Sequence, residues 1–113
     1  MPRYVILTHD HPHWHWDLML EWGSALRTWR LLESPDVDRS IAAERLGDHR
    51  ALYLDYEGPV SGGRGEVRRW DAGEYVIETE ASEELLLNLR GERLRGRYRL
   101  SGAGAQSLFE KCD

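Results

Sequence analysis

Residues 9–17 of the chain, HDHPHWHWD, gather four histidines and two aspartates at spacings that suit metal binding. Side chains alternate between the two faces of a strand, so His15 and Asp17 would share a face, with Cβ atoms about 6–7 Å apart. His9 precedes Pro12, which interrupts strand pairing, and a bulge there would return His9 toward the same point. Two imidazoles and a carboxylate suit Mn²⁺, Fe²⁺ or Zn²⁺ and leave coordination positions open. The alternative is a solvated polar loop, and it applies best to His11 and His13, which have no assigned partner.

The elements that would position these residues follow from the same alternation. The face opposite His15 and Asp17 is apolar, and we predict that it belongs to the hydrophobic core. The residues expected in the core, together with one tryptophan from the next strand, are Trp14, Trp16, Leu18, Leu20, Trp22 and Trp29.

Alternating apolar residues separated by glycine-containing breaks are typical of antiparallel hairpins. The strands are predicted near residues 3–8, 14–22, 25–32, 65–70, 74–80, 85–90, 93–100 and 107–111. Only DRSIAAERLG, residues 38–47, has a helical pattern, with Gly47 as its C-terminal cap. Short strands cover a chain of this length best as a closed sheet. The predicted fold is mostly β, a small antiparallel β-barrel with one short helix, forming a single domain over residues 1–113.

Composition limits the partners. The 113 residues include 15 Lys and Arg against 20 Asp and Glu, a net charge of -5, so nucleic acid would be attracted only locally and bound weakly. The one cysteine, Cys112, excludes an internal disulfide and makes the cytoplasm the expected compartment. YVIL near the start is too short for a signal or a membrane span, so no membrane partner is expected.

Two blocks, HDHPHWHWDLMLE and DHRALYLDYEG, resemble the 3′-phosphoesterase domain of bacterial DNA ligase D and its stand-alone relatives. That family has a His-Asp-Ala start, Leu-His-Tyr-Asp-Leu-Arg-Leu-Glu, and later Asp-His-Pro-Leu-Asp-Tyr-x-Asp-Phe-Glu-Gly. LRTWRL, VRRWDAGEY and RLRGRYRL are similar to other strands of the family, so the resemblance covers nearly the whole chain. It implies a small antiparallel β-barrel and a single phosphoesterase-like domain.

The resemblance also implies a function and a site. The family removes 3′-terminal ribonucleotides and 3′-phosphates from DNA ends during repair and uses a divalent metal, usually manganese. Carried over to this chain, His9, His15 and Asp17 would bind the metal, and His49 and Tyr53 would bind the substrate phosphate. His49 would also be catalytic. A ligase or polymerase of a repair assembly is the expected protein partner.

The chain departs from the family pattern at two cations. The family's phosphate-binding Arg is Met19 here, and its Lys in Val-Pro-Lys-Gly falls at Glu33. The sequence offers a replacement: a tight turn at Gly23 and Ser24 would pair Trp22 with Ala25, Leu20 with Arg27 and Asp17 with Arg30. Arg30 would then lie on the metal face, as a phosphate-binding and catalytic residue. The alternative is a structural ion pair between Arg30 and Asp17.

Three functions remain open from the sequence. The first is a metal-dependent phosphoesterase acting on nucleic-acid 3′ ends. The second is a catalytically degenerate relative that keeps the metal and acts as a binding module in a repair assembly, as the two missing cations would suggest. The third is a small iron oxygenase, because His15, Asp17 and a distant His49 also fit a triad of two histidines and one carboxylate. This third reading leaves His9 and the DYEG block unexplained.

Overall fold

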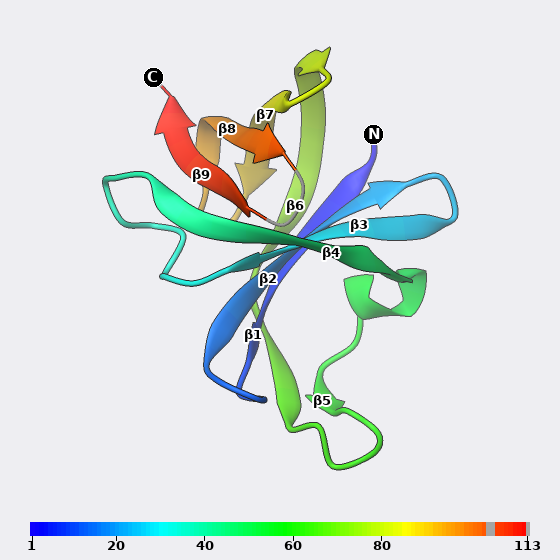
Figure 1. The fold of residues 1–113 in the computed structure, drawn as a ribbon. Helices are drawn as coiled ribbons and strands as arrows, with labels where there is room; N and C mark the ends of the chain where they lie inside the picture. Colours follow the sequence, from blue (N-terminus) through cyan, green and yellow to red (C-terminus); the bar gives the residue numbers. More distant parts are fainter. Residues whose placement is uncertain (104–105, 113) are drawn as a thin grey trace.

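The computed structural model describes residues 1–103 and 106–112, and these form a closed antiparallel β-barrel (Figure 1). The strands are β1 (Arg3–His9), β2 (His15–Trp22), β3 (Ala25–Leu31), β4 (Ile41–Arg50), β5 (Gly58–Pro59), β6 (Glu66–Ala81), β7 (Glu84–Gly91), β8 (Arg95–Ala103) and β9 (Gln106–Cys112). Neighbours in the sheet follow the order β1-β2-β3-β4-β9-β8-β7-β6, and pairing of β1 with β6 closes the barrel. The predicted β-barrel is therefore confirmed.

The helix predicted for residues 38–47 is wrong. Residues 41–50 form β4, in which Ile41 and Ala43 are buried and pair with Phe109 of β9 and Leu31 of β3. The helical propensity of the Ala, Glu and Arg residues there is overridden by pairing on both edges and by burial of alternate residues. In the described residues, the helical element is a single 3₁₀ turn, η1 (Ala51–Leu54). None of the described helical residues belongs to a segment long and apolar enough to cross a membrane.

The two strands predicted near 65–70 and 74–80 are one long strand, β6. Its first half pairs with β1 and its second half with β7, with register irregularities opposite Ile6–Leu7 and at Ile77–Thr79. Gly73, which lies between the two predicted strands, is a point of close approach within the sheet and not a break. A Cβ added there would lie 2.2 Å from the Arg90 carbonyl oxygen.

The walls of the barrel have two apolar layers. The inner layer fills the barrel and includes Leu18, Leu20 and Trp29. The second layer lies on the outer face of β1, β2 and β3, where Val5, Leu7, Met19 and Leu26 pack against Leu54 and Val67. The segment that contains η1 and β5 thus covers this outer face, which is why both faces of β1 and β2 are buried.

The core prediction holds for Leu18, Leu20 and Trp29, which are 0%, 0% and 5% exposed. Trp16 and Trp22 are partly buried against the same layer. Trp14 is wrongly predicted: it is 58% exposed. Strand β2 begins at His15, so the alternation does not reach residue 14, and the Trp14 ring only meets the Trp16 ring edge-on at 6.1 Å.

A buried carboxylate links two strands of the barrel and the turn between β7 and β8. Asp71 of β6 is 1% exposed. It accepts hydrogen bonds from the Tyr4 hydroxyl at 2.6 Å and from the backbone N–H groups of Arg93 and Leu94 at 2.8 and 3.1 Å. The carboxylate therefore fixes the turn between β7 and β8 onto β1. Burial, and then the hydrogen bond to Asp71, raise the pKa of the Tyr4 hydroxyl far above its ordinary value, so Tyr4 stays a donor.

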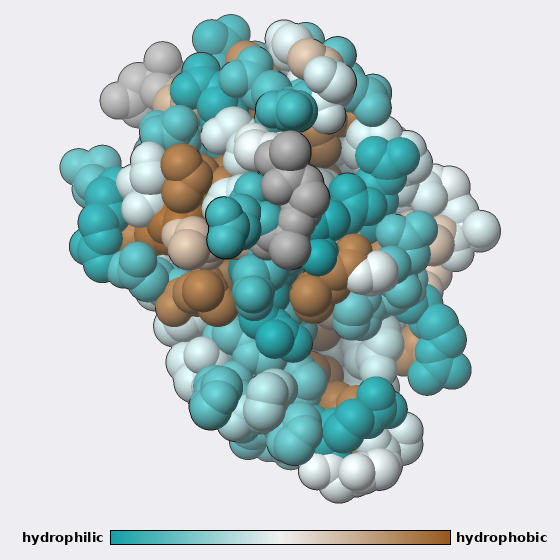
Figure 2. All heavy atoms as spheres, viewed as in Figure 1, coloured by the Kyte–Doolittle hydropathy of each residue, from teal (hydrophilic) through white to brown (hydrophobic). Residues whose placement is uncertain are grey.

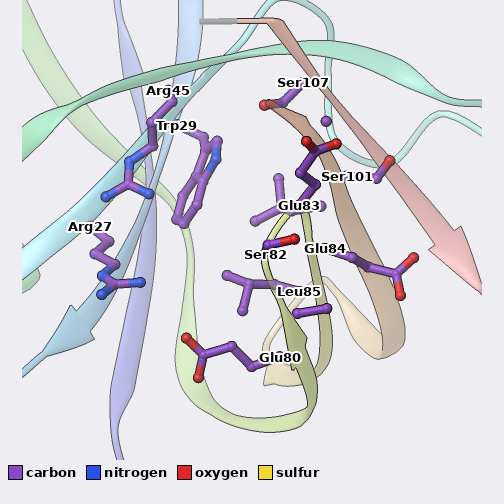
Figure 3. Close-up of a pocket in the computed structure, with 13 residues that line it drawn as sticks. Arg27, Trp29, Arg45, Glu80, Ser82, Glu83, Glu84, Leu85, Ser101 and Ser107 are labelled. Atoms are coloured by element: carbon purple, nitrogen blue, oxygen red, sulfur yellow. The ribbon is translucent and has the colours of Figure 1, made fainter. Parts of the chain in front are cut away.

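One end of the barrel is open beside the β6–β7 turn. The cavity there has a volume of about 520 Å³. Its two walls carry opposite charges: Arg27, Trp29 and Arg45 stand on one, and Glu80 and Glu83 on the other (Figure 3). The opposite end carries the β1–β2 connection and the β5–β6 loop, side by side at the bottom of Figure 1. The surface in this view is mostly hydrophilic with small apolar patches (Figure 2).

Candidate metal and phosphate site

The three predicted metal ligands come together at the end of β1 and β2. His9 and His15 are direct partners in the antiparallel ladder, and Asp17 follows two residues along β2 on the same face. One ligand atom from each lies within 4.8 Å of the others. The expected bulge at Pro12 is not needed to bring His9 back, because residues 10–14 simply connect the two strands and place His9 opposite His15.

Each imidazole is oriented by a backbone carbonyl on its far side. His9 donates through Nε2 to the carbonyl oxygen of Arg64 at 2.8 Å, and His15 donates through Nδ1 to that of His13 at 2.7 Å. A carbonyl can only accept, so these ring nitrogens carry the protons and the other nitrogen of each neutral ring presents a lone pair. Support of a ligand histidine by a carbonyl is usual at metal sites.

The lone pairs face a carboxylate. His15 Nε2 lies 3.3 Å from Asp17 Oδ1, and His9 Nδ1 lies 3.7 Å from Asp17 Oδ2. In the described residues, His15 Nε2 and Asp17 Oδ1 are buried without a hydrogen-bond partner. Two acceptors facing each other in a buried position are unfavourable unless a cation lies between them. The residues therefore fit a divalent metal, with two nitrogens and one carboxylate as ligands.

The proximity of these side chains also shifts the pKa values of His9 and Asp17. The neighbouring Asp17 carboxylate raises the pKa of His9 above its ordinary value, and the Arg64 carbonyl adds to the effect. Burial raises the pKa of Asp17, but the two imidazoles lower it more, so the net pKa lies below the ordinary value. The carboxylate is therefore ionised at neutral pH.

A cavity of about 320 Å³ opens beside this cluster on the outer face of the barrel. Five of the six residues predicted for the site line it: His9, Asp17, Arg30, His49 and Tyr53. His15 lies behind them and is 2% exposed. Strands β1 to β4, η1 and the loop before β6 all contribute to the lining.

The structure confirms the predicted register of Arg30. Strand β3 pairs Trp22 with Ala25, Leu20 with Arg27, and Asp17 with Arg30. Arg30 lines the same cavity as Asp17. Its guanidinium lies 3.9 Å from the Glu44 carboxylate. Among the described residues this is the ion pair that Arg30 forms, so the alternative of an ion pair with Asp17 is not observed. Within the part of the chain that the structure describes, the Arg30 Nε is buried without a hydrogen-bond partner.

His49 and Tyr53 form the opposite part of the lining. His49 is near the end of β4 and donates from Nδ1 to the Gly47 carbonyl at 3.0 Å. Its other ring nitrogen, Nε2, is therefore the one that can contact a substrate. The Tyr53 ring, in η1, lies edge-on to the His49 ring at 6.0 Å. Both rings are half-buried.

At the two positions where the chain departs from the family pattern, Met19 and Glu33, the structure places no cation in the cavity from the described residues. Met19 is 1% exposed and lines the cavity from β2. Glu33 pairs with Arg39 outside the cavity lining. The sequence analysis missed His11 and Arg64, which also line the cavity, and the carbonyls of His13 and Arg64. The contacts of backbone carbonyls leave no signal in the sequence. Arg64 did leave one, because it is a single charged residue among the glycines of GGRG.

The chain is similar to known proteins over most of its length. The family described as DNA Ligase D 3′-phosphoesterase domain matches residues 7–101. The chain belongs to that family. It is 32% identical over 108 residues to the multifunctional non-homologous end joining protein LigD of Pseudomonas aeruginosa, covering 87% of this chain and 13% of that protein. The corresponding protein of Mycobacterium tuberculosis, a DNA repair protein by name, is 31% identical over 106 residues, covering 86% of this chain and 14% of its own length.

The match to the phosphoesterase family includes both blocks on which the site depends, because residues 7–101 contain His9 to Asp17 as well as His49 and Tyr53. The chain spans about one-seventh of the length of these relatives. Membership therefore concerns this one domain of the larger proteins.

Proposed function

We propose that the chain is a divalent-metal-dependent phosphoesterase that acts on 3′ ends of nucleic acid, removing a 3′-phosphate or a 3′-ribonucleotide, in DNA repair by end joining. The observation that carries the proposal is the pair of buried atoms, His15 Nε2 and Asp17 Oδ1, which have no hydrogen-bond partner among the described residues and lie beside a cavity lined by Arg30, His49 and Tyr53. Family membership supports the substrate class, because the relatives are end-joining proteins by name.

His9, His15 and Asp17 would hold the metal, which we take to be Mn²⁺; the same ligand set also suits Zn²⁺ or Fe²⁺. A bound divalent ion supplies Lewis acidity, which polarises a phosphoryl oxygen and lowers the pKa of water. The carbonyls of His13 and Arg64 keep both imidazoles in the ligating tautomer.

The other residues act on the phosphate. The Arg30 guanidinium donates two parallel hydrogen bonds to phosphoryl oxygens and offsets the charge that develops there. His49 contacts the phosphate or, when protonated, transfers a proton to the leaving oxygen of the nucleic acid. The Tyr53 hydroxyl donates a further hydrogen bond. Because the chain has a net charge of -5, affinity for the rest of a long DNA should be weak, and a ligase or polymerase partner would bring the end to the site.

A second candidate, a metal-binding module without catalysis, is favoured by one observation. Met19 is apolar, and Glu33 forms an ion pair with Arg39 outside the cavity. Neither of the two positions where the family has a cation therefore supplies one to the cavity. The two candidates share the metal and differ in whether a phosphate ester is cleaved.

The test uses DNA primers that end in a 3′-phosphate or a 3′-ribonucleotide, with the metal content of the purified protein measured alongside. We expect bound divalent metal and release of phosphate. Arg30→Ala should keep the metal and lose esterase activity by about 100-fold or more, the scale for removing one positioned donor. Arg39→Ala is the control, because Arg39 pairs with Glu33 outside the cavity. Bound metal with no cleavage of either primer would favour the module instead.

A further inference from the structure

The loop between β5 and β6, residues 60–65, is held in one conformation by its own backbone. The Val60 N–H donates to the Gly65 carbonyl at 2.8 Å and closes the loop. Gly62, Gly63 and Gly65 have φ values of +77°, +67° and +75°, which side chains rarely adopt. The one charged side chain inside this loop is Arg64.

The loop is also fastened to the connection that carries His9. The Asp10 carboxylate accepts the backbone N–H of Glu66 at 2.8 Å. Gly65 packs so closely there that an added Cβ would lie 2.2 Å from Asp10 Oδ1. The Arg64 carbonyl accepts the His9 Nε2–H, so Arg64 is joined to a metal ligand by its main chain.

The Arg64 side chain is charged, and the hydrogen bonds that the described residues give it are both to Ser61. Its Nε donates to the Ser61 carbonyl at 2.7 Å and its Nη2 to the Ser61 hydroxyl at 3.3 Å. Both partners are neutral and lie within the loop. Arg64 is exposed and lines the cavity together with His9, Asp17 and Arg30. A positive charge thus stands at the cavity mouth, with part of its donor fork left for an anion.

We propose that Arg64 is a substrate-contacting residue that binds phosphate oxygens at the 3′ end, so that Arg30 of β3 and Arg64 of the loop together supply the cations that Met19 and Glu33 do not. The inference rests on the proposed function for the identity of the substrate. Arg64 has two separable parts: its carbonyl orients His9, and its guanidinium contacts the phosphate.

The two parts can be separated by experiment, because substitution of Arg64 keeps the carbonyl. The metal-loaded full chain is compared as wild type, Arg64→Ala, Arg64→Lys and Arg68→Ala. Arg68 is the matched control: it is an exposed arginine of β6 close to the loop in sequence, it pairs with Glu66, and it does not line the cavity. The measurements are metal content, affinity for inorganic phosphate by calorimetry, and kcat and KM on the 3′-phosphate primer.

We expect Arg64→Ala to bind phosphate about 10-fold to 100-fold more weakly, the scale for losing hydrogen bonds to a charged group. Arg64→Lys should recover part of the affinity, because lysine keeps the charge but not the fork. Metal content should be unchanged in all variants, and Arg68→Ala should behave as wild type. Equal phosphate affinity in Arg64→Ala and Arg68→Ala overturns the inference, as does loss of metal from Arg64→Ala.

The failure of this inference is distinguishable from failure of the proposed function. If the wild type binds phosphate in an Arg64-dependent way but releases none from the primers, the binding role stands and the esterase proposal fails. If the wild type cleaves the primer and Arg64→Ala cleaves it with the same kcat and KM, the esterase stands and the role of Arg64 fails. Absence of phosphate binding by the metal-loaded wild type also overturns the inference.

Discussion

Asp71 and Asp17 are both almost completely buried, at 1% and 3% exposure, but their surroundings are opposite. Asp71, on the inner side of the barrel, accepts hydrogen bonds from one hydroxyl and two backbone N–H groups. Asp17, on the outer face, meets two imidazoles through their lone pairs, and its Oδ1 has no partner in the described residues. The fold alone satisfies the first carboxylate, whereas it leaves one oxygen of the second without a hydrogen-bond partner among the described residues.

The two cavities differ in the same way. The cavity at the open end of the barrel is the larger, at about 520 Å³ against 320 Å³. In the described part of the chain, none of the polar atoms buried without a hydrogen-bond partner belongs to its lining, while Asp17 and Arg30 of the smaller cavity contribute one each. Unsatisfied polar groups, rather than burial or size, therefore distinguish the candidate site.

The largest effect should come from the satisfied carboxylate. Asp71→Ala removes the acceptor of two buried backbone N–H groups and leaves the Tyr4 hydroxyl only its long hydrogen bond to the Leu94 carbonyl, at 3.5 Å. We therefore expect a loss of about 3–5 kcal/mol in the free energy of unfolding. Urea unfolding with and without Mn²⁺ measures it. Asp71→Asn, which keeps one oxygen, should lose less. A loss below about 1 kcal/mol for Asp71→Ala would mean that the network does not hold the barrel together.

Asp17→Asn makes the contrasting change at the unsatisfied carboxylate. Metal affinity should fall by more than about 100-fold, because even residues that only support a ligand contribute 10-fold to 100-fold. The metal-free protein should change by less than about 1 kcal/mol, since the amide keeps the shape and can donate to His15 Nε2. At 100 times the dissociation constant, metal stabilises the wild type by about 2.7 kcal/mol, and the variant should lose this increment.

Calorimetric unfolding with and without Mn²⁺ measures that increment. His13→Ala is the control, because His13 contributes only its carbonyl to His15. If Asp17→Asn kept the metal-dependent increment, the assignment of Asp17 as a ligand would be wrong. If it destabilised the metal-free protein as much as Asp71→Ala does, the contrast between the two carboxylates would disappear.

The Asp17 side of this contrast could be predicted from the sequence, whereas nothing in the sequence singled out Asp71. Alternation along residues 15–22 separates His15 and Asp17 from Leu18 and Leu20, and a two-residue turn at Gly23 fixes the pairing of Asp17 with Arg30. These are local rules. They identified the barrel, one complete hairpin and one face of the site.

What could not be predicted depends on contacts between distant segments. β4 is a strand because it pairs with β3 and β9, against its local helical propensity. The outer face of β2 is buried because residues 51–67 fold over it, and nothing near Met19 in the sequence indicates that cover. The Arg64 carbonyl reaches His9 across 55 positions of the chain. The pairing of β1 with β6, which closes the barrel, brings the Arg64 carbonyl to His9, and no sequence motif indicates this contact.

The smallest effect is expected at the open end of the barrel. Arg45 lies over the Trp29 ring, 4.6 Å from its centroid, and its guanidinium is 3.6 Å from the Asp48 carboxylate. Arg45→Ala removes one partly exposed cation–π contact and a weak ion pair, so we expect a loss of about 0.5–1 kcal/mol in unfolding free energy. Metal affinity, phosphate affinity and primer cleavage should stay at wild-type values, because Arg45 lines a cavity in which the described residues leave no buried polar atom without a hydrogen-bond partner. Chemical denaturation and the phosphate titration together measure this. A fall in phosphate affinity comparable to that of Arg30→Ala would show that the larger cavity takes part in binding, and the distinction drawn from unsatisfied groups would then be wrong.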